Sequence, residues 1–248
     1  MTTTARTTVD QVKAQSASTL ASWRNRHRDG RAFILGCGPS LSRIPESTLR
    51  LLAYDPVTIA CNYLWRWPGL SFRPTLWAMS EWDHVEPVDR GLRALEREKS
   101  WLPVPRFIAG PDLEGHYERH MPQPYFDNWT LIERDMSKPI CQGYVGGFDG
   151  GLKAATGGGV VFECAVQLAA WAGATDIFLL GVDAEDTGYV YDRVGAIGVG
   201  ASLRKEIPRV AECMAESLLP HGIGLYNATP GGRLDSIPRV DLKDVFNA

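Results

Sequence analysis

A glycine-rich turn between an apolar segment and a predicted helix is the first candidate for chemistry in this sequence. Residues 32–35 are apolar, and Gly36, Gly38, Pro39 and Ser40 follow them. Glycine allows a backbone N–H to approach a ligand closely, and a helix N-terminus offers unpaired N–H donors and the positive end of a dipole. The order strand, turn and helix therefore predicts that these four residues bind the phosphate of a nucleotide-like ligand. The alternative is a plain strand-to-helix turn without a ligand.

This turn differs from two familiar phosphate-binding motifs. The dinucleotide-binding pattern needs a small residue where this sequence has Leu41, and an acidic residue at the end of the next strand. That predicted strand, 57–61, is followed by Asn62, whose amide can bond to a ribose or a base without repelling phosphate. The Gly-Lys-Ser/Thr ending of the P-loop is missing as well. We predict that Asn62 contacts the nucleotide.

A second glycine loop begins another unit of loop, helix and strand. Thr156, Gly157 and Gly158 precede residues 160–172, whose apolar side chains recur at helical spacing. The next segment, 177–182, is apolar in the way that a strand buried on both faces requires. We predict that the loop contributes backbone donors to the same ligand. Close packing of the helix on the sheet is a second explanation for the glycines.

Carboxylates and tyrosines follow this second buried strand. Asp183 ends it, and Asp186, Tyr189 and Tyr191 come shortly after. Ligands of open α/β sheets bind at the carboxyl ends of the strands, so we expect these side chains near the site. The carboxylates could bind a metal ion, orient a sugar hydroxyl or act as a base, or form only a solvated turn. The tyrosines could donate to a departing phosphate or only pack over a loop.

The elements that would position these residues predict an α/β, Rossmann-like domain. Its mostly parallel sheet would have about six strands, with helices on both faces. The predicted strands are 32–35, 57–61, 74–79, 106–109, 177–182 and 222–226, and the predicted helices are 9–28, 45–52, 86–99, 160–172, 203–218 and 237–246. We expect residues 1–30 to form an N-terminal helix and residues 31–248 to form a single nucleotide-binding domain. Residues 110–155 lack a hydrophobic period and are predicted to be a long irregular insertion over the site, or merely an irregular connection.

Composition narrows the classes of function. The chain has 248 residues and a formal net charge of −3, with no long basic run, which argues against a nucleic-acid partner. No stretch reaches the roughly 18 apolar residues of a membrane span, and the N-terminus has no signal-peptide pattern. The five scattered cysteines indicate reduced thiols. We expect a cytoplasmic protein without a membrane span, and the sequence leaves its oligomeric state open, a homo-oligomer included.

Taken in order, these motifs resemble a single Rossmann-like superfamily. Its members include the bacterial family-42 sialyltransferases, the motility accessory factors that glycosylate flagellin, and the archaeal 6-hydroxymethylpterin diphosphokinases. The resemblance covers residues 31–66 and 152–230. The matching positions are Gly36-x-Gly38-Pro39-Ser40-Leu41, Asn62, Thr156-Gly157-Gly158, Gly181-x-Asp183, Tyr189-x-Tyr191-Asp192 and Leu225-Tyr226-Asn227-Ala228-Thr229.

The resemblance implies a nucleotide-sugar donor and particular roles. In the sialyltransferases the first loop and the asparagine hold the nucleotide, the second loop contacts it, and two tyrosines stabilise the leaving phosphate. The positions here that match those roles are Gly38, Ser40, Asn62, Gly157, Gly158 and Tyr189. Those enzymes also use a histidine base downstream of the tyrosines, whereas this chain has no histidine between 121 and 220. The base would instead be Asp183 or Asp186, or come from His116 or His120.

The function expected from the sequence is transfer of a sugar from a nucleotide sugar to a hydroxyl of a protein or glycan. Asp183, Asp186, Tyr189 and Tyr191 would be the catalytic residues. The first alternative is an ATP-dependent diphosphokinase of a hydroxymethylpterin-like small molecule, which would need Mg²⁺ at Asp183, Asp186 and Glu81. The second alternative is a nucleotide-binding protein without catalytic activity.

Overall fold

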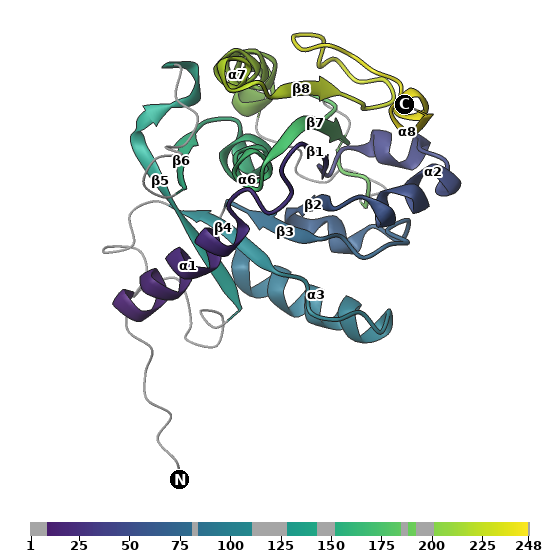
Figure 1. Ribbon diagram of the computed structural model, residues 1–248. Helices are drawn as coiled ribbons and strands as arrows, with labels where there is room; N and C mark the ends of the chain where they lie inside the picture. The colour runs from purple at the N-terminus through teal and green to yellow at the C-terminus, as the bar shows by residue number, and fades with distance from the viewer. Residues whose placement is uncertain are drawn as a thin grey trace.

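The computed structural model describes residues 9–80, 84–110, 128–142, 152–184, 188–191 and 201–247. Within these residues the chain forms one sheet of eight strands, and every pair of neighbouring strands is parallel (Figure 1). The strands are β1 (Gly30–Leu35), β2 (Val57–Cys61), β3 (Leu76–Met79), β4 (Arg106–Gly110), β5 (Trp129–Pro139), β6 (Lys153–Thr156), β7 (Ala174–Leu180) and β8 (Gly224–Asn227). Their order across the sheet is β6-β5-β4-β3-β2-β1-β7-β8.

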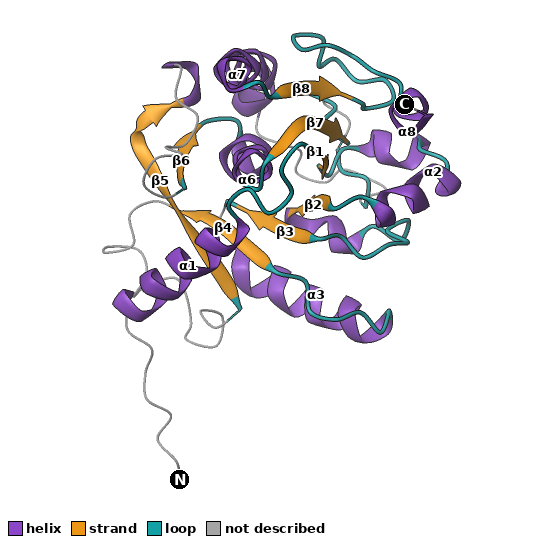
Figure 2. Ribbon diagram, viewed as in Figure 1, coloured by secondary structure: helices purple, strands orange, loops and turns teal. Residues whose placement is uncertain are grey.

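Helices cover both faces of this sheet (Figure 2). The α-helices are α1 (Val9–Trp23), α2 (Glu46–Leu51), α3 (Val85–Glu98), α6 (Gln167–Trp171), α7 (Ala201–Leu218) and α8 (Leu242–Asn247). Short 3-10 helices are η1 (Pro39–Arg43), η2 (Leu52–Tyr54), η3 (Asn62–Arg66), η5 (Ile140–Gln142) and η7 (Leu219–His221), and η6 (Val161–Val166) is a π-helix. None of the described helices is both long enough and apolar enough to cross a membrane.

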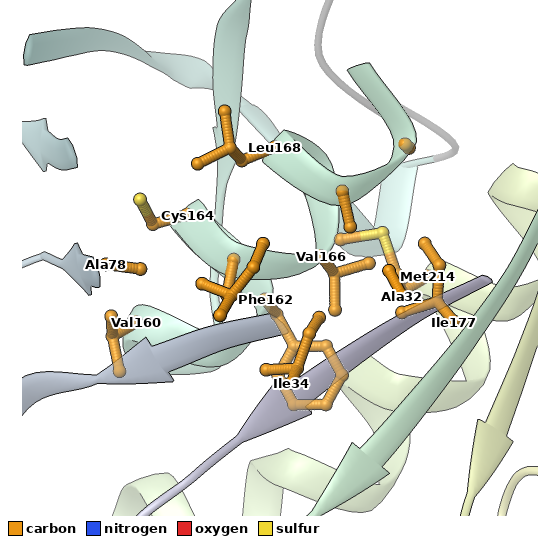
Figure 3. Close-up of a cluster of buried hydrophobic side chains, with 14 of the residues drawn as sticks. Ala32, Ile34, Ala78, Val160, Phe162, Cys164, Val166, Leu168, Ile177 and Met214 are labelled. Atoms are coloured by element: carbon orange, nitrogen blue, oxygen red, sulfur yellow. The ribbon is translucent and has the colours of Figure 1, made fainter. Parts of the chain in front are cut away.

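The central strands are apolar because both of their faces are buried. All five residues of β2 are buried, as are the last four of β1 and of β7. One face packs against η6, α6 and α7, and Figure 3 shows Phe162 and Val166 of η6 next to Ile34 of β1 and Ile177 of β7. The other face packs against η1, α2, α3 and α8. Helix α1 is fixed to the sheet region by two hydrogen bonds, from the Leu131 N–H to Ser16 Oγ (3.0 Å) and from Trp171 Nε1 to the Leu20 carbonyl (2.7 Å).

The topology places a switch point beside β1. From β1 the chain builds the sheet outward through β2, β3, β4, β5 and β6, and then returns to add β7 on the other side of β1. Leu35 at the end of β1 is paired with both Ala60 of β2 and Leu180 of β7. In open α/β sheets such a point, at the carboxyl ends of the strands, is where ligands bind. The first glycine loop leaves β1 at this point.

Six of the eight strands lie where the sequence predicted them, and the α/β, Rossmann-like class is confirmed. The prediction of about six strands was too low, and the prediction of an irregular insertion at 110–155 was wrong where the segment is described. It contains β5 and β6, which extend the sheet beyond β4. The second half of β5 is polar and pairs with the short edge strand β6. It therefore contains no apolar run from which the strand could be predicted. Residues 111–127 and 143–151 of the predicted insertion lie outside the described residues.

The predicted helix at 160–172 begins as the π-helix η6 before it continues as α6. The buried amide of Gln167 explains how the wider turn is tolerated. Its Nε2 donates to the carbonyls of Phe162 (2.8 Å) and Ala155 (3.1 Å), and its Oε1 accepts the Ala155 N–H (2.8 Å). Gln167 therefore pairs with edge strand β6 while it satisfies a carbonyl that the π-helical turn leaves available.

Candidate functional site

The first glycine loop continues the pairing of β1 with β7. The N–H of Gly36 donates to the Leu180 carbonyl (2.8 Å), and the N–H of Gly38 donates to the Gly181 carbonyl (2.8 Å). Gly38 has an ordinary φ of −70°, so its conformation does not require glycine. Its position does, because an added Cβ would lie 2.6 Å from the Gly181 carbonyl oxygen and even closer to the Asp183 carboxylate. The N–H groups of Gly36 and Gly38, which were predicted to bind a phosphate, thus donate to carbonyls of β7 and of the loop after it.

Asp183 joins the loops that follow β1 and β7. Its Oδ2 accepts the N–H of Ser40 (3.0 Å), close to the start of η1, and its carbonyl accepts the N–H of Arg233 (2.8 Å). Asp183 is only 7% exposed and Ser40 only 1% exposed. Asp183 Oδ1 and Ser40 Oγ are both buried, and neither has a hydrogen-bond partner among the described residues. The residue predicted to be catalytic therefore holds the predicted phosphate-binding loop in place.

Asn62 occupies a strained backbone conformation at the end of β2. Its φ is +45°, in the left-handed region where asparagine is one of the few tolerated residues with a side chain. The Asn62 carbonyl accepts a hydrogen bond from Trp77 Nε1 of β3 (2.9 Å), which fixes the peptide. Strained residues of this kind concentrate at functional sites. The predicted nucleotide contact thus lies at the carboxyl edge of the sheet.

Tyr189 and Tyr191 lie against the first glycine loop. The N–H of Val190, between them, donates to the carbonyl of Cys37 in that loop (2.9 Å). The two tyrosine rings are stacked, with centroids 5.2 Å apart and an interplanar angle of 14°. The structure therefore brings together two regions that the sequence analysis predicted separately.

A cation and a third tyrosine from η3 complete this aromatic group. The guanidinium carbon of Arg66 lies 5.0 Å from the centre of the Tyr191 ring, and the Tyr63 ring lies 6.5 Å from it. The sequence analysis did not single out Tyr63 or Arg66. A usable signal existed, because both follow directly after the predicted strand 57–61 and so belong to its carboxyl end.

His84 is the third residue that the sequence analysis missed. It stands immediately before α3, and its Nδ1 lies 2.7 Å from the hydroxyl of Tyr63. The two rings meet edge to face, with centroids 5.5 Å apart. Nothing in the sequence around His84 indicates this contact, because it depends on β2 and β3 being neighbours.

The second glycine loop is held at the β6 end of the sheet. The N–H of Gly157 donates to Glu163 Oε1 (2.9 Å), and Glu163 Oε2 accepts a hydrogen bond from Arg134 of β5 (2.6 Å). Gly157 and Gly158 have φ values of +126° and +78°, which disfavour residues with a side chain. Four strands separate β6 from β1 in the sheet order. A shared role of Thr156, Gly157 and Gly158 with the first loop stays a prediction.

Several predicted side chains lie outside the described residues: Asp186, Glu81, His116 and His120. Within the described ranges, no group of three or more His, Cys, Asp or Glu side chains is placed to hold a metal ion. The Asp183 carboxylate is directed at a backbone N–H. A Mg²⁺ site at Asp183, Asp186 and Glu81 stays a prediction, because two of these three residues lie outside the described ranges.

The buried Cys61 thiol at this edge of the sheet is a poor nucleophile. Burial raises the pKa of Cys61 well above its usual value, and the nearby Cys37 and Cys164 raise it further. The Cys37 thiol donates to the Cys61 carbonyl (3.3 Å). A cysteine reacts through its thiolate, so a neutral Cys61 is chemically inert at physiological pH.

The Rossmann-like fold of this chain is similar to that of solved structures. In sequence the chain matches no protein-family model and no curated protein. In structure it is similar to the MAf glycosyltransferase from Magnetospirillum magneticum AMB-1, with a TM-score of 0.56 and 15% identity over 94% of this chain. The present chain spans only 39% of the length of that glycosyltransferase chain.

A second solved structure is similar over most of both chains. It is the sialyltransferase CST-II in complex with a trisaccharide acceptor and CMP, with a TM-score of 0.51 and 17% identity over 84% of each chain. The predicted resemblance to the sialyltransferase and MAf glycosyltransferase group is confirmed at the level of the fold. The resemblance to pterin diphosphokinases stays a prediction.

Proposed function

We propose that this protein is a glycosyltransferase that moves a sugar from a nucleotide-sugar donor to a hydroxyl of a protein or glycan acceptor. The observation that carries the proposal is the hydrogen bond from the Val190 N–H to the Cys37 carbonyl, which holds Tyr189 and Tyr191 against the first glycine loop. The two structural neighbours support it, because one is a glycosyltransferase and the other a sialyltransferase with CMP bound.

The side chains supply what departure of a nucleotide phosphate requires. As the bond between the sugar and the phosphate breaks, negative charge grows on the phosphate oxygens. In our proposal the hydroxyls of Tyr189 and Tyr191 donate to those oxygens, and the Arg66 guanidinium beside Tyr191 adds a positive charge. Asn62 contacts the nucleotide from the end of β2.

Asp183 acts in this proposal as a positioning residue. Its Oδ2 is bound to the Ser40 N–H and its side chain is buried, so its contribution is to fix the loop after β1. Asp186 remains a candidate catalytic carboxylate. In this proposal the loop shapes the nucleotide-binding edge through Gly36, Gly38, Pro39 and Ser40. The N–H groups of the two glycines and of Ser40 bond within the protein.

Thermal denaturation with CMP, UDP, GDP, ADP and ATP, each with and without Mg²⁺, tests the proposal first. A ligand that binds only the folded state raises the melting temperature. Stabilisation by CMP, UDP or GDP, followed by turnover of the corresponding nucleotide sugar, is the expected result. Stabilisation by ATP with Mg²⁺ alone would instead indicate the diphosphokinase, and binding without turnover of any donor would indicate a non-catalytic protein.

The tyrosine assignment has its own matched control. Tyr191→Phe should lower turnover at least tenfold and leave the nucleotide-induced rise in melting temperature intact, because the lost hydroxyl acts on the departing phosphate. Tyr54 is 86% exposed in η2, so Tyr54→Phe should leave both quantities unchanged. Unchanged turnover in Tyr191→Phe would remove that tyrosine from the mechanism.

A further inference from the structure

The hydrogen bond between Tyr63 and His84 links two neighbouring strands at the edge where the candidate site lies. Tyr63 follows β2 and His84 precedes α3, the helix after β3, and the two strands pair with Cys61 opposite Ala78. The Tyr63 hydroxyl and His84 Nδ1 are 2.7 Å apart, and both side chains are partly buried. This is the short separation of a well-formed hydrogen bond, in which the Tyr63 hydroxyl donates to Nδ1 when the His84 proton is on Nε2.

The same pair borders the aromatic group that faces the proposed leaving phosphate. The centres of the Tyr63 and Tyr191 rings are 6.5 Å apart, and Arg66 lies over Tyr191. A phenol and an imidazole therefore stand beside the groups that would stabilise the nucleotide. The described structure thus brings a titratable nitrogen to this edge, whereas the Asp183 carboxylate is buried and bound to Ser40.

We propose that Tyr63 and His84 accept the proton of the acceptor hydroxyl during glycosyl transfer, an inference that rests on the proposed function. The acceptor oxygen forms a bond to the sugar carbon as the bond from that carbon to the phosphate breaks. The phosphate leaves with the bonding electron pair. The acceptor proton passes to Tyr63 Oη, and the original phenol proton passes to His84 Nδ1, which leaves neutral tyrosine and an imidazolium ion.

The acid–base chemistry of the two side chains suits these roles, in which Tyr63 accepts the acceptor proton and His84 accepts the phenol proton. A phenol alone is a poor proton acceptor at neutral pH, because its phenolate forms only near pH 10. A neutral imidazole beside it can take the phenol proton at the moment the acceptor proton arrives, so no free phenolate is required. Tyr63 is the catalytic residue in this scheme, and His84 acts through it.

The test uses the full chain and the nucleotide sugar that the wild type turns over. His84→Asn keeps a polar group near the place of Nδ1 but cannot hold the proton, and Tyr63→Phe keeps the ring but removes Oη. Both variants should lower kcat by roughly 10²-fold or more, the usual contribution of general base catalysis, with KM for the acceptor unchanged. His221→Asn, at an exposed position in η7, is the matched control and should behave as the wild type.

Two further measurements separate this role from a structural one. The nucleotide-induced rise in melting temperature should be the same in wild type, His84→Asn and Tyr63→Phe. Added imidazole should restore turnover in His84→Gly and leave His84→Asn unaffected. If one variant does not fold, the other decides.

The outcomes distinguish the two proposals. Wild-type kcat in a folded His84→Asn or Tyr63→Phe, or an equal loss of kcat and nucleotide binding, overturns the assignment of this pair alone. A wild type that neither binds a nucleotide nor turns over a nucleotide sugar overturns the proposed function, and the assignment of the pair with it.

Discussion

Replacing Gly38 by alanine tests how the loop after β1 is held against β7. The backbone angles at Gly38 (φ −70°, ψ 149°) suit any residue, so the substitution introduces no conformational strain. The new Cβ would instead lie 2.6 Å from the Gly181 carbonyl oxygen and 2.8 Å from Asp183 Cγ. Contacts this short cannot persist, so the Asp183 carboxylate or the Gly181 peptide must move.

The expected cost follows from the two hydrogen bonds that such a movement breaks. The bond from the Ser40 N–H to the Asp183 carboxylate is worth about 1.5–3 kcal/mol, and that from the Gly38 N–H to the Gly181 carbonyl about 0.5–1.5 kcal/mol. Alanine restricts the unfolded chain and returns about 0.4–1 kcal/mol. We therefore expect Gly38→Ala to lower the free energy of unfolding by about 1–4 kcal/mol.

Urea denaturation followed by tryptophan fluorescence measures this change, and a double-mutant cycle locates it. If collision with Asp183 causes the loss, Gly38→Ala should cost at least about 1 kcal/mol less in an Asp183→Ala background. Gly222→Ala is a control for backbone conformation, because φ there is +72° and, its chain neighbours apart, no heavy atom of the described residues lies within 4 Å of the added Cβ. A Gly38→Ala variant as stable as the wild type, or strictly additive effects in the cycle, would refute the reasoning.

Three further predictions concern the core. Asp89→Ala should cost about 1.5–3 kcal/mol in urea denaturation, because the buried Arg106 loses one of its two carboxylates and keeps the other, Glu96; an unchanged midpoint would contradict this. Gln167→Leu should cost about 2–5 kcal/mol by the same assay, since it leaves the N–H and carbonyl of Ala155 unpaired; wild-type stability would show that β6 does not depend on this amide. Burial raises the pKa of Cys164 from 9.0 to about 12, so folding favours the neutral thiol. The contribution of this thiol to the free energy of unfolding should be complete below pH 9 and be lost as the pH rises toward 12. An equal loss of stability at alkaline pH in wild type and Cys164→Ala would exclude that thiol as a contributor.

The sequence predicts those strands that have to be apolar. β1, β2 and β7 are covered on both faces, so nearly continuous apolar runs mark them. β5 and β6 lie at the edge of the sheet, where this requirement relaxes. β5 carries Arg134, which forms an ion pair with Glu163, where the central strands have apolar residues. The strand therefore resembles a polar loop in sequence.

The candidate site was predictable where it depends on strand ends, and was missed where it depends on contacts between strands. The first glycine loop, Asn62 and the two tyrosines all follow buried strands, so their presence at one edge could be inferred. The bond of Asp183 to Ser40 requires the exact approach of β7 to β1. The pairing of Tyr63 with His84 requires β2 and β3 to be neighbours, which no local pattern encodes.

The place of β1 in the sheet has a consequence for how the chain folds. Gly30 pairs with Ala174 and Leu35 with Leu180, so one side of β1 stays without a neighbour until β7 has been synthesised. Pairing between segments so distant in the chain is slow, and an unpaired strand edge invites association with other chains in the meantime. Nascent chains that stop before β7 are therefore expected to aggregate or bind chaperones. The edge that we propose to bind the nucleotide can form only when translation has passed Asp183.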